Sequence, residues 1–324
     1  MNFVKLALNS GGSIKPLLIN PEDLSGPSLT NPSVLVIDGK IIVNIRNVNY
    51  TLYHSELNKF EHLWGPLSYI HPENDMHLRT TNYIAELDDD LNVVHYTKID
   101  TSKFDTYPPQ WEFVGLEDAR LIEWNGRVYI CGVRRDLDPI GTGRMELSGL
   151  EFTETDVIEV SRYRIPGPPP DKEYCMKNCT PIEGMPYHLL KWTNPTALMK
   201  FDTNGGETEV FETTTQVPGI SDMRGGSQVI KYNGGYLTLV HETQLYNSEQ
   251  GRKNATYRHR FVFWDKDFKN QKFSKLFSFL SMKIEFCCGL AEYKDDFLIT
   301  FGAQDNAAYI LRVSKSFVKD FINE

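Results

Sequence analysis

The stretch GLEDAR at residues 115–120 stands directly before a short apolar segment at 121–122 and begins the pattern that decides the fold. The chain then turns at Asn125-Gly126, returns as the apolar segment 128–133 and ends in Arg134-Arg135. Two apolar segments joined by Asn-Gly are a strong signal for a β-hairpin. Acidic residues at the entry to a buried strand are costly unless they are paired or functional. The stretch therefore predicts a hairpin whose open end carries functional polar groups.

The same pattern recurs along the chain: a polar or small motif, an apolar strand, a Gly, Asp or Asn turn, a longer apolar strand, and a polar residue. The predicted hairpins lie near residues 31–46, 117–135, 177–192, 224–242 and 285–305. Further strand-like segments follow them, for example at 196–201 and 308–313. Repeated four-stranded antiparallel units arranged radially form a β-propeller. The chain is therefore predicted to be all-β, with residues 1–324 forming a single five-bladed β-propeller domain.

A propeller directs one end of every inner strand toward its central channel. The polar residues stand at the open ends of the predicted hairpins, so we expect them to converge in one axial pocket. This arrangement would bring together Asn31 and Asp305, which lie near opposite ends of the sequence. Helical periodicity is weak, with one short turn expected at 318–323 and the first twenty residues left undecided.

Composition narrows the classes of function. The 324 residues carry 34 Lys and Arg against 43 Asp and Glu, a net charge of −9. An acidic chain with no long basic run is a poor candidate for binding nucleic acid or an anionic membrane surface. There is no signal-peptide pattern and no apolar run of membrane-spanning length, so a soluble cytoplasmic protein is expected. Aromatic residues make up 12% of the chain, which suits β-rich packing and sugar stacking.

The cysteines predict neither disulfides nor a metal site. The chain has five cysteines, an odd number, and no secretory signal, which favours reduced thiols. Cys175 and Cys179 are close in sequence, but no second pair of Cys or His residues at ligand spacing completes a zinc site. No metal and no cofactor are therefore expected.

Several motifs, taken together, resemble glycoside hydrolase family 130. Residues 115–120 resemble that family's Glu-Asp-Pro-Arg motif, and Asn31 followed by Arg46 resembles its sugar-binding Asn and Arg. Further likenesses, in chain order, are Lys177-Asn178 before Pro181, residues 239–241, residues 284–289 and residues 299–305. The resemblance spans about residues 30–313. The chain departs from the pattern at Ala119, Asn178 and Glu285, which stand where the family commonly has Pro, Asp and an apolar residue.

The resemblance implies a five-bladed propeller and the chemistry of inverting β-mannoside phosphorylases and related hydrolases. A similar propeller serves the β-mannosyltransferases of glycosyltransferase family 108. By analogy with the family, Asp118 is the expected general acid, which protonates the leaving oxygen through a sugar hydroxyl. The residues expected to bind the sugar are Asn31, Arg46, Glu117, Arg120 and Asp305. A structural alternative is that Glu117, Asp118 and Arg120 form a buried ion pair that pins one blade.

The side of the pocket opposite Asp118 should decide the reaction. A phosphorylase must hold phosphate and a sugar-nucleotide transferase must hold a diphosphate, and both need cationic side chains. Candidates for this role are Lys177, Arg224, His241, Arg258, His259 and Arg260. They favour an enzyme that transfers a β-linked sugar, with mannose expected, to or from phosphate by inversion. Inorganic phosphate or a sugar nucleotide would be the co-substrate, and an oligosaccharide the partner.

Three alternatives stay open. The first is a sugar-nucleotide-dependent glycosyltransferase of the same fold. The second is a hydrolase that uses Glu242 or Glu285 as its base, because an inverting hydrolase needs a second carboxylate. The third is a non-catalytic propeller that binds glycan or protein. Assembly into a homo-oligomer is compatible with the sequence, which also leaves the linkage and the acceptor undetermined.

Overall fold

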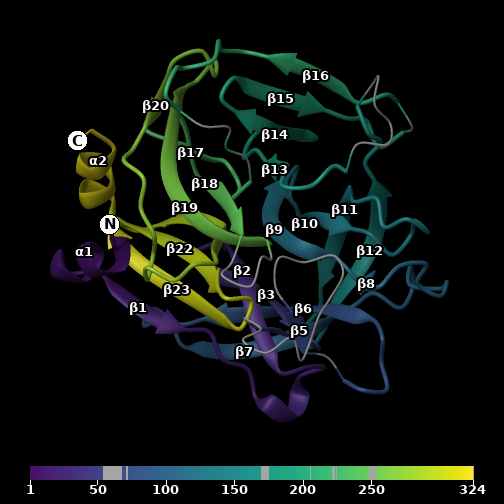
Figure 1. Ribbon diagram of the computed structural model, residues 1–324. Helices are drawn as coiled ribbons and strands as arrows, with labels where there is room; N and C mark the ends of the chain where they lie inside the picture. The colour runs from purple at the N-terminus through teal and green to yellow at the C-terminus, as the bar shows by residue number, and fades with distance from the viewer. Residues whose placement is uncertain are drawn as a thin grey trace.

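The structure is a computed structural model that describes residues 1–53, 68–70, 72–168, 175–204, 206–220, 223, 225–247 and 253–323. The described chain consists mostly of β-strands, as predicted, and its helices lie near the two ends (Figure 1). The helical elements are α1 (Phe3–Asn9), η1 (Pro21–Asp23) and α2 (Lys315–Asn323). Neither α-helix of these described residues is long and apolar enough to cross a membrane.

The strands pair into antiparallel runs of four. The first run is β2 (Ser28–Ile37), β3 (Lys40–Val48), β6 (Leu78–Leu87) and β7 (Val93–Asp100). The second is β9 (Glu117–Trp124), β10 (Arg127–Arg134), β11 (Arg144–Phe152) and β12 (Val157–Arg164). A short parallel pairing of β7 with β12 joins these two runs into one sheet, to which β8 (Phe113–Val114) adds beside β6.

The remaining strands complete three further sheets and a small ribbon. The third run is β13 (Thr180–Pro181), β14 (His188–Thr193), β15 (Thr196–Lys200) and β16 (Glu209–Glu212). The fourth is β17 (Ile230–Tyr232), β18 (Gly235–Asn247), β19 (Lys253–Asp265) and β20 (Gln271–Phe273). The fifth is β21 (Glu285–Tyr293), β22 (Asp296–Ala303), β23 (Ala307–Ser314) and β1 (Ser13–Pro16). The pair β4 (Thr51–Tyr53) and β5 (Ser68–Ile70) stands apart.

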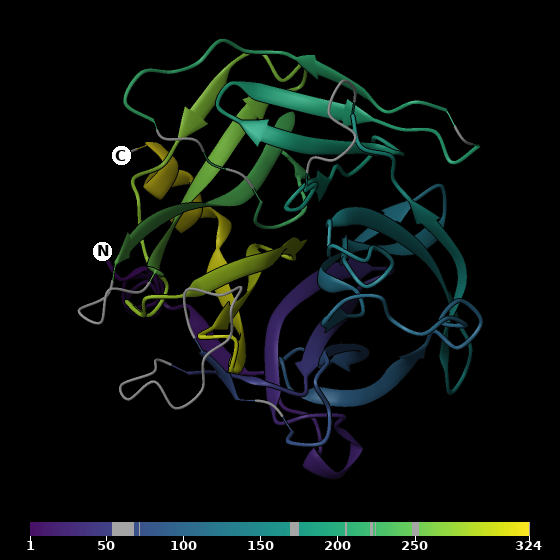
Figure 2. The ribbon, with the colours of Figure 1, turned by 45° about the vertical axis from the view of Figure 1, so that its right-hand side comes forward.

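We call these runs units one to five. Each predicted hairpin region contains the first two strands of one unit. The two-residue turns follow from sequence. Positive φ is adopted there by Asp38, Asn125, Asn233 and Lys294; the first three are followed by glycine and Lys294 by aspartate. The units lie around a common centre, with the first strands of each toward the middle (Figures 1 and 2).

Apolar side chains fill the space between neighbouring units. One buried cluster joins units one and two through residues such as Ile84 and Leu121, and the next joins units two and three through Trp124 and Leu189. Comparable clusters join units three and four, four and five, and five and one. The hydrophobic cores therefore follow one another around the centre, and every unit is held by two neighbours.

The N-terminal segment completes unit five. Strand β1 pairs antiparallel with β23, from Ser13 opposite Arg312 to Pro16 opposite Tyr309. Helix α1 packs beside it, where the Phe3 ring stacks on Phe277 at 4.5 Å and contacts Phe321 of α2 edge-on at 5.1 Å. The two ends of the chain therefore stabilise the same unit (Figure 1).

Candidate active site

A β-bulge interrupts the first strand of several units near the centre of the molecule. In unit one the register shifts between Thr30 and Ser33, and in unit two between Glu117 and Arg120. The bulge residues Asn31 and Asp118 adopt the left-handed backbone, with φ of 41° and 50°. Asn and Asp tolerate this conformation better than other residues that carry a side chain. The bulges redirect both side chains toward the centre.

Four predicted sugar-binding or catalytic side chains meet there. The Arg46 Nη1 atom lies 2.8 Å from Oδ1 of Asp118. The Asn31 amide donates to the same oxygen at 2.8 Å and to Oδ1 of Asp305 at 3.4 Å. These residues come from units one, two and five, so three sheets contribute to one polar cluster. We call Asn31, Arg46, Asp118 and Asp305 the axial cluster.

Arg46 is held at the base of the axial cluster. Its side chain is only 4% exposed. Its Nη2 atom donates to the Tyr50 hydroxyl at 2.7 Å and lies 3.5 Å from Glu117, while Nε donates to Thr80 at 3.2 Å. A guanidinium with so many partners has one orientation, which in turn fixes the carboxylate of Asp118.

The three carboxyl groups of this region titrate differently. Burial alone would raise the pKa of Asp118, but Arg46, Arg120 and the Asn31 amide outweigh it and lower that pKa. Burial raises the pKa of Glu117, and attraction to Arg46 offsets only part of the shift. Burial also raises the pKa of Asp305 despite Arg46, and the negative charge of Asp118 adds to the effect. Asp118 is thus the carboxylate that stays ionised, while Glu117 and Asp305 retain a proton more readily.

Arg120 lies behind the axial cluster instead of facing a ligand. Its side chain is fully buried, with Nη1 donating to the Asp118 carbonyl at 2.5 Å and Nε to the Gly226 carbonyl at 2.9 Å. We expected Arg120 to contact the sugar. Its side chain instead points inward from β9 and donates to backbone carbonyl groups. Arg120 instead holds the bulge of unit two against unit four.

His241 and Tyr257 approach the axial cluster from unit four. Their rings stack at 5.1 Å, and His241 Nδ1 lies 3.2 Å from the Gly225 carbonyl. Burial, with help from the nearby positive charges of Arg120 and Lys177, lowers the pKa of His241 to about 4. Burial and the charges of Asp305 and Asp118 raise the pKa of Tyr257 to about 12. His241 is therefore neutral at pH 7, and Tyr257 keeps its hydroxyl proton.

The basic residues at 258–260 do not converge as predicted. Successive side chains of β19 point to opposite faces. His259 is fully buried between Phe277 and Phe279, where burial lowers its pKa well below the usual value. Arg260 donates to the Ser274 carbonyl at 2.7 Å, and Arg258 is exposed beside a surface depression that Met1 also lines. Among the contacts of the described residues, none joins these three side chains to the axial cluster.

Lys177 remains a candidate cation on the open side of the site. It is exposed, and its charge acts on the titration of Glu117, Asp118 and His241. The neighbouring Asn178 has a φ of 62° and therefore shares the left-handed backbone conformation of Asn31 and Asp118. The predicted role of Arg224 concerns a residue outside the described part of the chain.

Glu285 is not available as the base of a hydrolase. Its carboxylate is fully buried and accepts backbone N–H groups of Phe279 at 2.6 Å, Leu280 at 2.8 Å and Met282 at 2.8 Å. It closes a turn behind β21. Glu242 follows His241 on β18 and so points to the other face of the strand, where its charge acts on Arg260.

Sequence reasoning missed Tyr257 and Thr80. Tyr257 stands two residues before His259, and strand alternation would have identified it as the central-facing residue near the bulges if the register of β19 had been known. Thr80 supports Arg46 from β6, a strand with no recognisable motif. Within the described residues, no group of His, Cys, Asp or Glu side chains could hold a metal ion.

No protein-family model matches the chain, and no curated protein matches its sequence. Solved structures do match its fold. One comes from glycoside hydrolase family 130, a family of mannoside phosphorylases that contains hydrolases targeting β-1,2 mannosidic linkages in Candida mannan. Its TM-score is 0.57 at 14% sequence identity, and the match covers 93% of this chain and 92% of that one.

Two further structures extend the comparison. The β-1,2-mannobiose phosphorylase of Listeria innocua has a TM-score of 0.55 at 14% identity, covering 96% of each chain. A GDP-Man-dependent mannosyltransferase from Leishmania mexicana has a TM-score of 0.50 at 12% identity, covering 94% of this chain and 91% of that one. The chain therefore has the fold of the family 130 mannoside phosphorylases and hydrolases over nearly its whole length.

Proposed function

We propose that the protein is a carbohydrate-active enzyme that transfers a β-linked sugar, with mannose the expected sugar, to or from phosphate with inversion. In this proposal the five units are the blades of a five-bladed propeller, and the axial cluster is the sugar site. The succession of apolar cores between neighbouring units supports the propeller. The fold shared with mannoside phosphorylases supports the class of reaction.

The observation that carries the proposal is the meeting of Asn31, Arg46, Asp118 and Asp305 from three units. These side chains are 274 positions apart at the extremes, yet the Asn31 amide contacts both carboxylates. Carboxylates, an amide and a guanidinium grouped in this way are the usual means of fixing neighbouring hydroxyls of a sugar ring. The side chain of Asp118 is 20% exposed, so a ligand can reach it.

Asp118 is the proposed general acid, and its lowered pKa sets a condition on that role. Inverting cleavage needs a proton at the leaving oxygen. In the free site Asp118 is ionised and does not hold that proton. The proton must therefore arrive with the substrate or come from Glu117 or Asp305, whose pKa values are raised. Once protonated in the complex, Asp118 would pass its proton to a sugar hydroxyl, which would give up its own proton to the leaving oxygen.

Phosphate as co-substrate is favoured over water. Exposed Lys177 lies near enough to buried His241 for its charge to act on that side chain, and Glu285, one of the two candidate bases for a hydrolase, is tied to backbone groups. A sugar nucleotide is the second candidate donor, because the mannosyltransferase structure has the same fold. Both donors present a phosphate oxygen at the anomeric position, which is the group that the cationic side would hold.

The test compares donors directly. The protein is incubated with mannose 1-phosphate or GDP-mannose over a panel of mannosides, and the released phosphate or GDP and the extended glycan are quantified. Product from mannose 1-phosphate alone, lost in Asp118→Asn, supports the phosphorylase. Product from GDP-mannose alone would replace it with the transferase. No turnover with either donor, with undiminished glycan binding by Asp118→Asn, would leave a non-catalytic glycan-binding propeller.

A further inference from the structure

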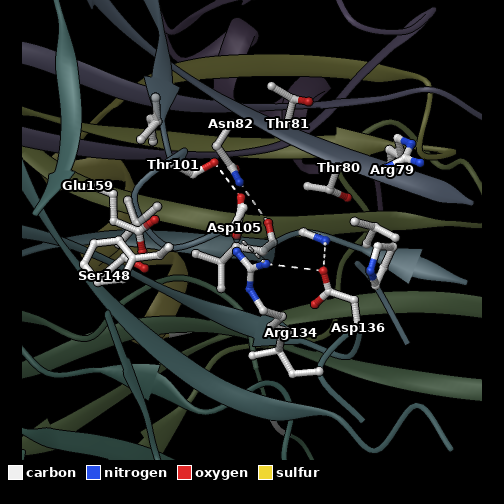
Figure 3. A pocket seen from close by; sticks show the side chains of 18 of the residues that line it. Arg79, Thr80, Thr81, Asn82, Thr101, Asp105, Arg134, Asp136, Ser148 and Glu159 are labelled. Carbon is white, nitrogen blue, oxygen red and sulfur yellow. Dashed lines mark hydrogen bonds and ion pairs between the residues drawn. The ribbon is translucent and has the colours of Figure 1, made fainter. Parts of the chain in front are cut away.

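A cavity lies between units one and two, and its lining does not include the residues of the axial cluster. It encloses about 350 Å³, within the range of roughly 300–1,000 Å³ typical of small-molecule sites. Strands β6, β7, β10, β11 and β12 contribute to its walls, and residues of the segment 101–116 complete the lining (Figure 3). We call it the inter-unit pocket.

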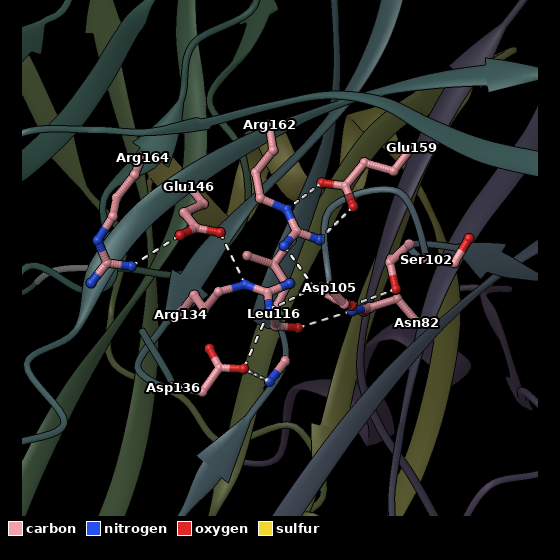
Figure 4. Close-up of polar contacts among 12 residues, drawn as sticks. Asn82, Ser102, Asp105, Leu116, Arg134, Asp136, Glu146, Glu159, Arg162 and Arg164 are labelled. Atoms are coloured by element: carbon pink, nitrogen blue, oxygen red, sulfur yellow. Dashed lines mark hydrogen bonds and ion pairs between the residues drawn. The ribbon is translucent and has the colours of Figure 1, made fainter. Parts of the chain in front are cut away.

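Its lining holds three basic side chains, Arg79, Lys98 and Arg134, and three acidic ones, Asp105, Asp136 and Glu159, so its formal charges balance. Arg134 lies 3.2 Å from Asp105, 3.3 Å from Asp136 and 3.0 Å from Glu146, and its side chain is 5% exposed (Figure 4). Arg162 contacts Asp105 and Glu159, each at 2.6 Å. Because each guanidinium already faces carboxylates, neither a free anion nor a free cation finds an unopposed counter-charge among them. The pocket is polar, but it is nearly balanced in charge.

One buried acceptor in the pocket has no partner. Oδ2 of Asp136 accepts the Gly115 N–H at 3.1 Å and contacts Arg134, whereas Oδ1 has no hydrogen-bond partner among the described residues. The Asp136 side chain is only 6% exposed. A buried carboxylate oxygen without a donor is costly. Asp136 lines the pocket, so a ligand hydroxyl bound there is the candidate donor to its carboxylate.

The remaining lining suits a hydroxylated ligand. Thr80, Thr81 and Ser148 bring hydroxyl groups to the walls. Tyr107 stands at the rim with 81% of its surface exposed, a high value for an aromatic residue. An exposed aromatic ring beside hydrogen-bonding groups is the usual composition of a sugar site, because the ring covers the apolar face of a pyranose.

The inter-unit pocket is physically coupled to the axial cluster. Thr80 lines the pocket, and its hydroxyl accepts a hydrogen bond from Nε of Arg46 at 3.2 Å. Gly115 and Leu116, which also line it, directly precede Glu117 in the chain. A ligand in the pocket would therefore lie behind the residues that orient Asp118.

We propose that the inter-unit pocket binds a neutral pyranose unit, separate from the sugar held by the axial cluster. The assignment of this unit to the enzyme's own glycan rests on the proposed function. The pyranose donates a hydroxyl to Asp136 and stacks on Tyr107. It is supplied either by the far end of an oligosaccharide substrate or by a free saccharide.

The first experiment measures binding without turnover. Mannobiose, cellobiose and lactose are titrated by calorimetry into Asp305→Ala protein, in which the axial cluster is weakened. We expect saturable binding of at least one disaccharide, weakened about tenfold when Tyr107→Ala or Asp136→Asn is added, the loss of about 1.4 kcal/mol that one good contact represents. Phe211→Ala, which removes an exposed aromatic ring from β16, is the matched control and should change nothing. Asp136→Asn could weaken binding through a folding defect, whereas Tyr107 is exposed and Tyr107→Ala should leave the melting temperature unchanged. Tyr107→Ala therefore tests the pocket independently of folding.

The second experiment distinguishes the two sources. If the pocket holds the far end of a substrate, Tyr107→Ala raises KM for mannotriose or longer chains about tenfold with kcat unchanged. If it holds a free saccharide, these KM values stay as in the wild type while calorimetric binding is lost. Absence of saturable binding by every disaccharide, or binding unaffected by both Tyr107→Ala and Asp136→Asn, overturns the proposal. Failure of turnover with intact pocket binding would count against the proposed function alone.

Discussion

Asp118 enters the axial cluster from a left-handed backbone position, and its surroundings keep its carboxylate ionised. The Asn31 amide and the Arg46 guanidinium both contact Oδ1, each at 2.8 Å. Contacts of this kind favour the charged form. The adjacent Glu117 has the opposite titration behaviour, because burial raises its pKa and Arg46, at 3.5 Å, offsets only part of that shift. Two neighbouring residues of one motif therefore differ in protonation for structural reasons.

Asp118→Asn should abolish most of the turnover. The amide keeps the size of the side chain but can neither pass a proton to a sugar hydroxyl nor neutralise Arg46. General acid catalysis contributes about 10²–10⁴-fold, so we expect a loss of kcat of at least about 10²-fold, measured as sugar phosphate consumed. Asp267→Asn, an exposed acid beyond β19, is the control and should retain full activity. Wild-type rates in Asp118→Asn would contradict the proposed role.

His241 should bind anions more tightly as the pH falls. Its pKa is about 4 in the free protein, so an anion that contacts it must raise that pKa and draw in a proton. Affinity then rises toward low pH by at most tenfold per pH unit. Sulfate, whose charge is constant over this range, is titrated between pH 7 and 5. The rise should be smaller in His241→Gln; an equal rise in both proteins would assign it to other groups, such as Glu117 and Asp305.

At the scale of the element, the feature that matters is the bulge repeated at the inner strands. Asn31, Asp118, Asn178 and Gly225 all adopt positive φ shortly before or within the first strand of their unit. In unit four the strands approach especially closely, since Gly226 has φ of 149° and a Cβ there would lie 1.8 Å from the Leu239 carbonyl oxygen. Only glycine permits this close approach of the two backbones. Arg120 then donates to the carbonyl of Gly226, which links the bulge of unit two to unit four.

Gly226→Ala should destabilise the protein markedly. The added methyl group has no room, and L-residues rarely adopt this backbone conformation. We expect a loss of at least about 2 kcal/mol in the free energy of unfolding, measured by urea denaturation. Gly206→Ala is the matched control, because its Cβ would meet only the Asp202 side chain, at 3.3 Å. Equal free energies of unfolding for both variants would show that the strands of unit four can move apart without loss of stability.

At the scale of the whole molecule, stability depends on keeping every interface between units closed. Strand β1 and helix α1 contribute to this by completing unit five. Two histidines are buried at or near the junction of units four and five, His241 with 7% exposure and His259 with none. Both have lowered pKa values because burial penalises their charged form. The junction therefore carries a pH sensitivity that extends beyond the site.

The free energy of unfolding should fall as the pH drops below about 6.5. The unfolded chain protonates these histidines near their ordinary pKa of about 6.5, whereas folded His241 protonates only near pH 4. More protons bind to the unfolded state in this window, so acid favours unfolding. We expect His241 to contribute a loss of about 2 kcal/mol between pH 6.5 and 5. Chemical denaturation at each pH should give a shallower dependence in His241→Gln; an unchanged slope would contradict this contribution.

Much of the architecture could be predicted from the chain itself. Hairpin turns are local, so Asn125-Gly126 and Asn233-Gly234 indicate them without knowledge of the rest of the fold. Their regular recurrence implied repeated units, and units with a common polar end implied convergence. Asn31, Arg46, Asp118 and Asp305 meet as this reasoning requires. The first strand β1 was missed because its four residues carry little periodicity and belong to a sheet formed by the other end of the chain.

The sequence by itself determined where the hairpins turn and which polar motifs stand at their open ends, because both depend on neighbouring residues. Only the tertiary structure decided which of those side chains face the centre. Register and burial send Arg120 to backbone carbonyls, enclose His259 among phenylalanines and tie Glu285 to a turn, while Tyr257 joins the site. A side chain's direction depends on strand alternation, bulges and the packing of other units against it, and these contacts join residues far apart in the chain.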